Sequence, residues 1–248
     1  MKILVCISHV PDTTSKINFT NNLSEFDPNG ITFVINPYDE FGLTRAMKIK
    51  ESTGATITVL NVGPTSTEPT LRKALAIGAD DAVRIDAEPK DACSVAQIIA
   101  NYAKGQNYDL IITGRESIDY NGGIVPGMLA AHLDLPFVNA CIGLELDGTN
   151  AKLTREIDGG KEHLKASLPI LIAGQKGLVE EKELRIPAMR GIMMARKKPL
   201  TVVAATDVTQ HTSVLKFELP EEKAACTMID AQNVDQLVEL LHTQAKVL

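Results

Sequence analysis

The sequence has 248 residues, 44% hydrophobic and 23% charged, which is ordinary for a globular chain with one large core. A net charge of −6 and only 4% aromatic residues argue against nucleic-acid binding. No apolar run approaches the roughly 20 residues that span a bilayer, and the apolar start Met1–Ile7 is too short for a signal peptide. We therefore expect a cytoplasmic α/β protein.

The N-terminal half alternates buried strands with amphipathic helices. The predicted strands are Lys2–Ser8, Thr56–Val62, Asp81–Ile85 and Leu110–Ile112. The predicted helices are Glu40–Ser52, Glu68–Ile77, Ser94–Ala103 and a helix that includes Met128–Leu133. Asn36 is expected to cap the first helix, Gly78 to end the second in a left-handed conformation, and Lys16–Phe19 to form a small hairpin with Gly30–Val34. The alternation predicts right-handed crossovers and a parallel sheet.

Loops at the carboxyl ends of parallel strands form the ligand sites of open α/β sheets. His9–Thr13, Asn36–Asp39 and Val62–Pro64 are therefore expected to converge with Gly114–Val125 around one ligand. The loop Arg115–Gly123 is polar and rich in glycine, and it leads into a helix N-terminus, which favours a phosphate or another anion. An ordinary strand–helix turn is the alternative. The first strand is not followed by GxGxxG, which argues against a standard dinucleotide-binding domain.

The pattern changes after Val138. Short alternating segments separated by Asp-Gly turns predict an antiparallel extension: Ala140–Glu145, Ala151–Glu156 and Lys161–Ser167. Further strands are expected at Leu168–Ala173 and Thr201–Ala205, with a short helix rich in methionine and basic residues at Ala188–Lys198. The polar tail after residue 205 ends in a predicted amphipathic helix, Val234–Ala245, which we expect to pack on another surface, often another subunit.

Five segments together resemble the β subunit of electron transfer flavoproteins. Arg155–Gly160 followed by Leu168-Pro169, and the run from Met189 to the basic Arg196–Lys198, resemble the signature region of this family. The other three resemble its nucleotide-contacting loops: Gly114–Asp119 with Leu135-Pro136, Asn36-Pro37, and Val62–Pro64. The resemblance extends over nearly the whole chain.

This resemblance implies an electron carrier subunit rather than a bond-making enzyme. The partner would be an α subunit that carries most contacts to the redox FAD, and the heterodimer would pass electrons from flavin dehydrogenases to a quinone oxidoreductase or another acceptor. The implied fold is an adenine-nucleotide α-hydrolase-like domain, residues 1–205, followed by a C-terminal arm, residues 206–248, on the α subunit. The β subunit would hold a structural AMP. In bifurcating relatives a second FAD takes its place.

By position in the family pattern, the following residues would line the nucleotide: Cys6, Asn36, Pro37, Tyr38, Asp39, Val62, Gly114, Asp119, Tyr120, Asn121, Gly122, Gly123, Ile124 and Val125. The family loop usually carries Asn-Gln-Thr or Ala-Gln-Val, whereas this chain has Gly-Ile-Val at 123–125, so backbone N–H groups would hold the phosphate. We favour AMP. The bifurcating alternative stays open because the loops Asn36–Asp39 and Val10–Thr13 look more like that branch, whereas Arg155–Gly160 looks like the ordinary one.

Three residues are expected to contact partners. Met189 matches the hydrophobic anchor of a docking loop at about residues 183–198, and its alternative is a core position in a short helix. Arg185, together with the run Arg196–Lys198, would steer acidic partners, and the alternative is an ordinary solvated face. Glu156 matches a glutamate at the flavin-domain interface, and its alternative is an ordinary carboxylate at a strand edge.

No catalytic or metal-binding residue is expected. Cys6 has no adjacent base, so we expect it to pack against the nucleotide rather than to act as a nucleophile. The four cysteines are scattered without a CxxC pair, which argues against a metal site or a disulfide framework and fits a reducing cytoplasm. A free-standing nucleotide sensor of the universal-stress type is the alternative from another class. The long region after Val138 argues against it.

Overall fold

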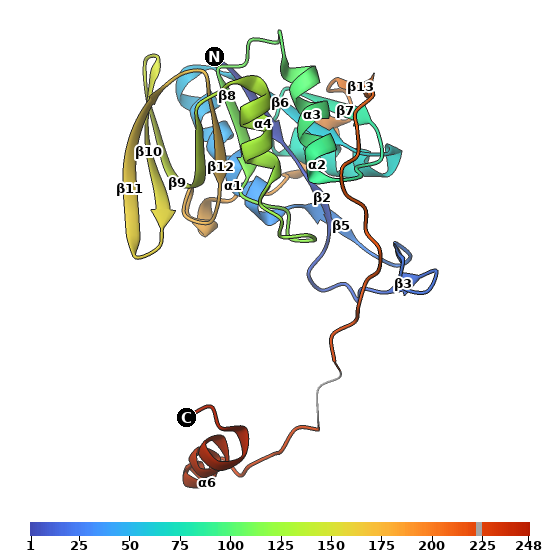
Figure 1. The fold of residues 1–248 in the computed structure, drawn as a ribbon. Coiled ribbons are helices and arrows are strands. Elements are labelled where there is room, and N and C mark those ends of the chain that lie inside the picture. The colour runs from blue at the N-terminus through green and yellow to red at the C-terminus, as the bar shows by residue number, and fades with distance from the viewer. Residues whose placement is uncertain (222–224) are drawn as a thin grey trace.

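The computed structural model describes residues 1–221 and 225–248, and its centre is a nine-stranded sheet in the order β11-β10-β9-β12-β8-β1-β6-β7-β13 (Figure 1). Its strands are β1 (Lys2–Cys6), β6 (Thr56–Val62), β7 (Asp81–Asp86), β8 (Leu110–Gly114), β9 (Phe137–Asp147), β10 (Asn150–Ile157), β11 (Gly160–Ser167), β12 (Ile170–Gly174) and β13 (Leu200–Ala204). From β9 through β12, β8, β1, β6 and β7 to β13, each strand pairs in parallel with the next. β10 pairs antiparallel with both β9 and β11. The predicted parallel sheet and antiparallel extension are therefore confirmed.

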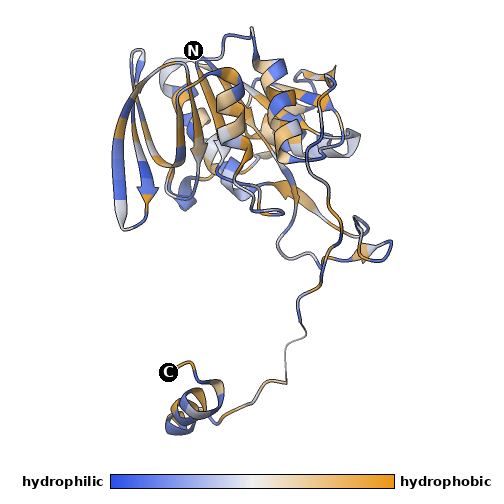
Figure 2. Ribbon diagram, viewed as in Figure 1, coloured by the Kyte–Doolittle hydropathy of each residue, from blue (hydrophilic) through white to orange (hydrophobic). Residues whose placement is uncertain are grey.

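Helices cover both faces of the parallel part of the sheet (Figure 1). They are α1 (Pro37–Thr53), α2 (Glu68–Ile77), α3 (Ala92–Ala103), α4 (Val125–Leu133) and α5 (Met189–Ala195). Alternation along β1 shows the two layers, because Ile3 and Val5 pack with residues of α1 and α2, whereas Leu4 and Cys6 pack with residues of α3 and α4. Figure 2 shows the resulting apolar interior of the sheet.

The antiparallel extension follows the predicted hairpin turns. Gly148 and Gly159 lie in these turns with φ of +60° and +81°, a conformation that glycine adopts without a steric penalty. Along β10, Ala151 and Leu153 are buried, whereas Lys152 between them is exposed. The extension therefore adds one apolar face to the core.

The hairpin predicted near the N-terminus is wrong. β3 (Phe19–Thr20) pairs with β4 (Glu25–Phe26), and β2 (His9–Pro11) pairs with β5 (Phe33–Ile35). The His9 ring stacks on the Phe33 ring, with centroids 4.3 Å apart, and so supports the second pairing. Part of the loop expected at His9–Thr13 is therefore a short strand.

The C-terminal arm follows β13 and touches the domain at a few points before leaving it. Asp91 accepts the N–H groups of His211 and Thr212, and the Phe217 ring stacks on Phe19 at 4.5 Å. Beyond these contacts, α6 (Val234–Leu240) and the π-helical turn Leu241–Ala245 lie apart from the α/β domain (Figure 1). Short 3₁₀ helices are also found at Thr65–Thr67 and Glu181–Glu183. None of the helices within residues 1–221 and 225–248 has the length and hydropathy of a membrane span.

Candidate functional site

The carboxyl ends of β1, β6 and β8 lie side by side at the lower edge of the sheet in Figure 1. The chain runs from β1 to β6 and β7 on one side and then returns to place β8 on the other side of β1. Such a reversal of strand order opens the crevice in which α/β sheets bind ligands. The loops after these strands are therefore the candidate site.

Asp39, in the first turn of α1, joins the ends of β1 and β8. Its Oδ2 accepts the Ser8 N–H at 2.7 Å, and its Oδ1 accepts the Gly114 N–H at 2.8 Å. The side chain is buried, which raises the pKa of Asp39 to about 7, although hydrogen bonds from Ser8, Asn36 and Gly114 oppose this shift. Asp39 is thus a structural bridge.

Asn36 is the second connection to the loop after β8. Its Nδ2 donates to the Glu116 carbonyl at 2.9 Å, and its Oδ1 accepts the Ile118 N–H at 3.2 Å. The prediction that this side chain caps α1 is wrong, because it makes no capping hydrogen bond to the helix and both ends of its amide bind the loop instead. We call Asn36, Asp39 and Gly114 the loop clamp.

Gly114 completes the loop clamp by leaving space. A Cβ at this position would lie 2.3 Å from Asp39 Oδ1 and 2.8 Å from Tyr38 Cβ. Such distances are not tolerated by packed atoms, so the close approach of β8 to α1 requires a glycine. This glycine therefore serves the clamp, whereas sequence analysis assigned it to the ligand.

The loop beyond the clamp faces solvent. Asp119 accepts the N–H of Tyr120, whose side chain is 67% exposed, and Asn121 and Gly123 have positive φ values of +50° and +61°. The N–H groups of residues 122–124 have no hydrogen-bond partner within the described part of the chain, and α4 has no side-chain cap. These unpaired donors beside a helix N-terminus suit a phosphate, so this segment fits the nucleotide that the resemblance implies.

The remaining predicted lining residues lie at the same strand ends and at the start of α1. Val62 ends β6, Pro37 opens α1, and the centre of the Tyr38 ring lies 5.3 Å from the Arg115 guanidinium. Cys6 ends β1, and burial together with the nearby Asp39 carboxylate raises the pKa of its thiol far above the ordinary range. A thiol that stays protonated is a packing residue.

Arg84 supports the loop after β6, and sequence analysis missed it. Its guanidinium donates to the Gly63 carbonyl at 3.0 Å and pairs with Glu68 at 3.0 Å and with Asp86 at 2.5 Å. Only 5% of the side chain is exposed. The signal was an arginine inside the apolar strand at residues 81–85, since a buried charge needs partners.

A second set of missed residues connects the loop to β10. Arg115 donates to Gln175 at 3.0 Å, and Gln175 in turn donates to the carboxylate of Glu156. Arg115 also pairs with Glu116 at 2.5 Å. Gln175 is buried directly after β12, where a polar side chain at the carboxyl end of a strand was the available signal.

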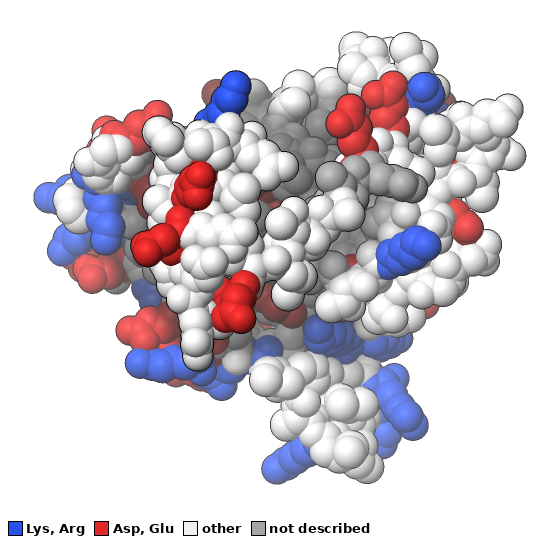
Figure 3. Space-filling model, turned by 90° about the horizontal axis from the view of Figure 1, so that it is seen from below, with Lys and Arg blue, Asp and Glu red and all other residues white. Residues whose placement is uncertain are grey.

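The other two predicted partner residues lie near α5. Arg185 is held by both carboxylate oxygens of Glu51, at 2.8 and 2.9 Å, and Met189 is 75% exposed. A core position for Met189 is therefore wrong. Seen from below, most lysines and arginines lie toward the margins of the molecule (Figure 3).

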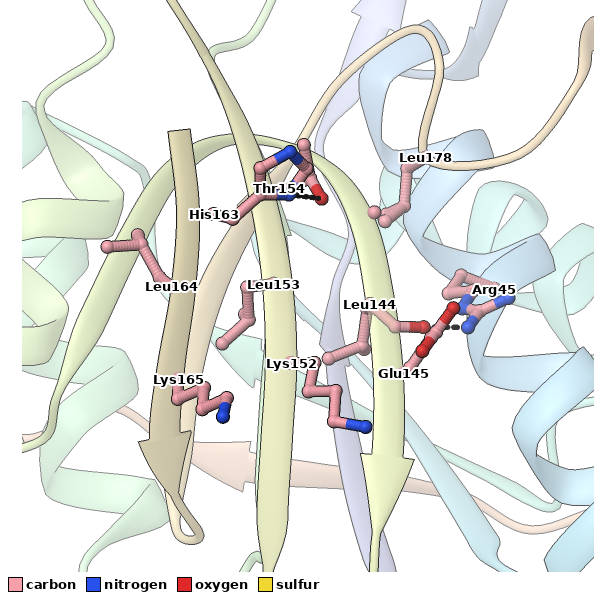
Figure 4. A pocket seen from close by; sticks show the side chains of 11 residues that line it. Arg45, Leu144, Glu145, Lys152, Leu153, Thr154, His163, Leu164, Lys165 and Leu178 are labelled. Atoms are coloured by element: carbon pink, nitrogen blue, oxygen red, sulfur yellow. Dashed lines mark hydrogen bonds between the residues drawn. The ribbon is translucent and has the colours of Figure 1, made fainter. Parts of the chain in front are cut away.

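A cavity of about 500 Å³ lies away from these loops, along the antiparallel extension (Figure 4). Arg45 reaches into it from α1 and donates to the Leu144 carbonyl, and Lys152 and Lys165 lie on neighbouring strands. No cluster of three or more metal-ligating side chains occurs among the residues that the structure describes.

Known proteins match this chain over most of its length. The electron transfer flavoprotein domain family matches residues 25–208. Curated relatives named electron transfer flavoprotein subunit beta include one from Bacillus subtilis, 36% identical over all of both chains. Another, from Syntrophomonas wolfei, is 36% identical over 93% of this chain and 90% of the relative, and the human one is 28% identical over 93% of each. The chain therefore belongs to the electron transfer flavoprotein family, among its β subunits.

Proposed function

We propose that this chain pairs with an α subunit to form a cytoplasmic electron carrier. The heterodimer takes electrons from flavin dehydrogenases and passes them to a quinone oxidoreductase or another acceptor. FAD, held mostly by the α subunit, supplies the reversible uptake of electrons when bound. This chain binds a nucleotide, holds the α subunit and docks partners.

The ligand proposed for the crevice is a structural AMP. The observation that carries this proposal is the clamped loop, in which unpaired N–H groups at residues 122–124 lie beside the start of α4. The phosphate would bind these groups, and Val62 and Tyr38 would flank the rest of the nucleotide. Asn36 bonds to the loop through both ends of its amide, and Asp39 joins the Gly114 N–H to the Ser8 N–H. These two side chains would therefore position the loop rather than contact the ligand.

The arm, residues 206–248, is the proposed contact with the α subunit. Leu215 and Met228 are 87% and 86% exposed, and α6 also leaves Val234 and Val238 exposed. Apolar side chains along an extended segment are typical of a surface that a partner covers. Glu156 would contact the flavin domain, and the segment 183–198, with Arg185 and Met189, would dock dehydrogenases.

Reconstitution with the α subunit tests this proposal. The two chains, expressed together, are expected to co-elute in gel filtration as a yellow 1:1 complex whose flavin is reduced by a dehydrogenase and its substrate. A colourless chain that elutes alone would contradict the proposal and favour a free-standing nucleotide-binding protein.

A further inference from the structure

α5 is a short helix whose large apolar side chains face solvent. Of its seven residues only Ala195 is buried, whereas Met193 and Met194 are 66% and 52% exposed. A helix of this length does not form on its own in water. Contacts on its inner side must therefore hold it in place.

Two cations cap the carboxyl ends of α2 and α5 reciprocally. Arg72, on α2, donates through Nη1 to the carbonyls of Ala195 and Lys198, both at 2.8 Å, at the end of α5. Lys198 donates through Nζ to the carbonyls of Leu75 and Ala79, at 3.0 and 2.5 Å, at the end of α2. Carbonyls at a helix C-terminus lack intrahelical partners and attract cations. α5 thus receives a cap from α2, and α2 receives a cap from the segment that directly follows α5.

Gly191 fixes the side of α5 that faces α2. A Cβ at this position would lie 2.3 Å from the Ala76 carbonyl oxygen, which belongs to the backbone and cannot turn away. The two helix backbones are therefore in contact at this point. The inner side and the C-terminus of α5 are therefore both fixed. The exposed side with Met189, Met193 and Met194, which we call the methionine face, is fixed with them.

We propose that Arg72 and Lys198 are positioning residues for partner docking, which hold the methionine face of α5 in its docking conformation before a partner arrives. This inference rests on the docking role proposed for Met189. A surface that is already ordered avoids the entropy cost of ordering upon binding, so affinity is gained without any new contact. Neither Arg72 nor Lys198 needs to touch the partner.

Amide hydrogen exchange in the purified αβ heterodimer tests the reciprocal caps directly. Arg72→Met and Lys198→Met keep the apolar stems and remove the donors. Each is expected to speed exchange across residues 189–195 by about tenfold while leaving β13 unchanged. Lys73→Met is the matched control, because Lys73 lines the same groove between α2 and α5 but pairs with Glu40 at 3.4 Å. Exchange within twofold of the wild type in both variants would overturn the proposal.

Steady-state kinetics separates positioning from a merely structural role. With a purified flavin dehydrogenase as electron donor, Arg72→Met is expected to raise KM for the heterodimer about tenfold at unchanged kcat, and Arg72→Lys to restore part of the loss. An unchanged KM, or an equal loss in kcat, would overturn the positioning role. If Met189→Ala also leaves KM unchanged, the docking role in the proposed function fails, whereas the exchange result still reports on the reciprocal caps.

Discussion

Gly114→Ala removes the space on which the loop clamp depends. The added methyl group would lie 2.3 Å from Asp39 Oδ1, so the hydrogen bond between this oxygen and the Gly114 N–H, 2.8 Å long, cannot persist. Leaving a buried hydrogen-bonding group without its partner costs about 1–3 kcal/mol, and overpacking costs about 1–3 kcal/mol more. We therefore expect the free energy of unfolding to fall by about 2–6 kcal/mol, less whatever the loop recovers by shifting.

Gly122→Ala provides the control for this substitution. Gly122 lies in the same loop and does not have a positive φ, and a methyl group added there would have no atom within 4 Å. Urea unfolding should leave this variant within about 0.5 kcal/mol of the wild type, whereas Gly114→Ala should lose both stability and nucleotide. Equal stability of the two variants would refute the clamp.

Three more substitutions test the same region. Burial raises the pKa of Asp39 from 3.8 to about 7, so its contribution to stability is present in full below pH 4 and is lost as the pH rises through 7. In Asp39→Asn this decline, up to about 4 kcal/mol, should disappear from urea unfolding measured between pH 4 and 8. Parallel pH profiles of the wild type and the variant would contradict this prediction. Asn36→Ala removes both loop hydrogen bonds and should cost about 2–3 kcal/mol with loss of nucleotide; full nucleotide retention would argue against it. Arg84→Met leaves the Gly63 carbonyl without its hydrogen-bond donor and should lower the free energy of unfolding in urea by about 1–3 kcal/mol. An unchanged unfolding midpoint would show that the loop after β6 does not depend on this hydrogen bond.

Periodicity predicted the elements that bury a continuous apolar face. Thr56–Val62 and Glu68–Ile77 have the predicted bounds, because a strand between two helical layers and a helix ended by a glycine leave strong local signals. The hairpin at Lys16–Phe19 was wrong, since short polar segments do not specify a partner strand. Phe19 instead pairs with Phe26 across a turn formed by three residues with positive φ, Asn21–Leu23.

The sequence predicts where the candidate site lies, but not which group each of its side chains contacts. Loops at strand ends converge by topology, so the sequence indicates where Asn36, Asp39 and Gly114 meet. Whether an amide or a carboxylate faces the ligand or the neighbouring loop depends on distances across the fold, which spacing does not encode. Arg115 and Gln175 interact for the same reason although they lie 60 residues apart.

The nucleotide content of the purified αβ complex tests the central claim most directly. Denaturing the complex and separating the released nucleotides by chromatography with absorbance detection gives the amount of each per heterodimer. We predict one FAD and one AMP, with the AMP lost in Gly114→Ala. Two FAD without AMP would place the chain among bifurcating flavoproteins, and one FAD alone would show that the backbone donors of residues 122–124 do not hold a phosphate.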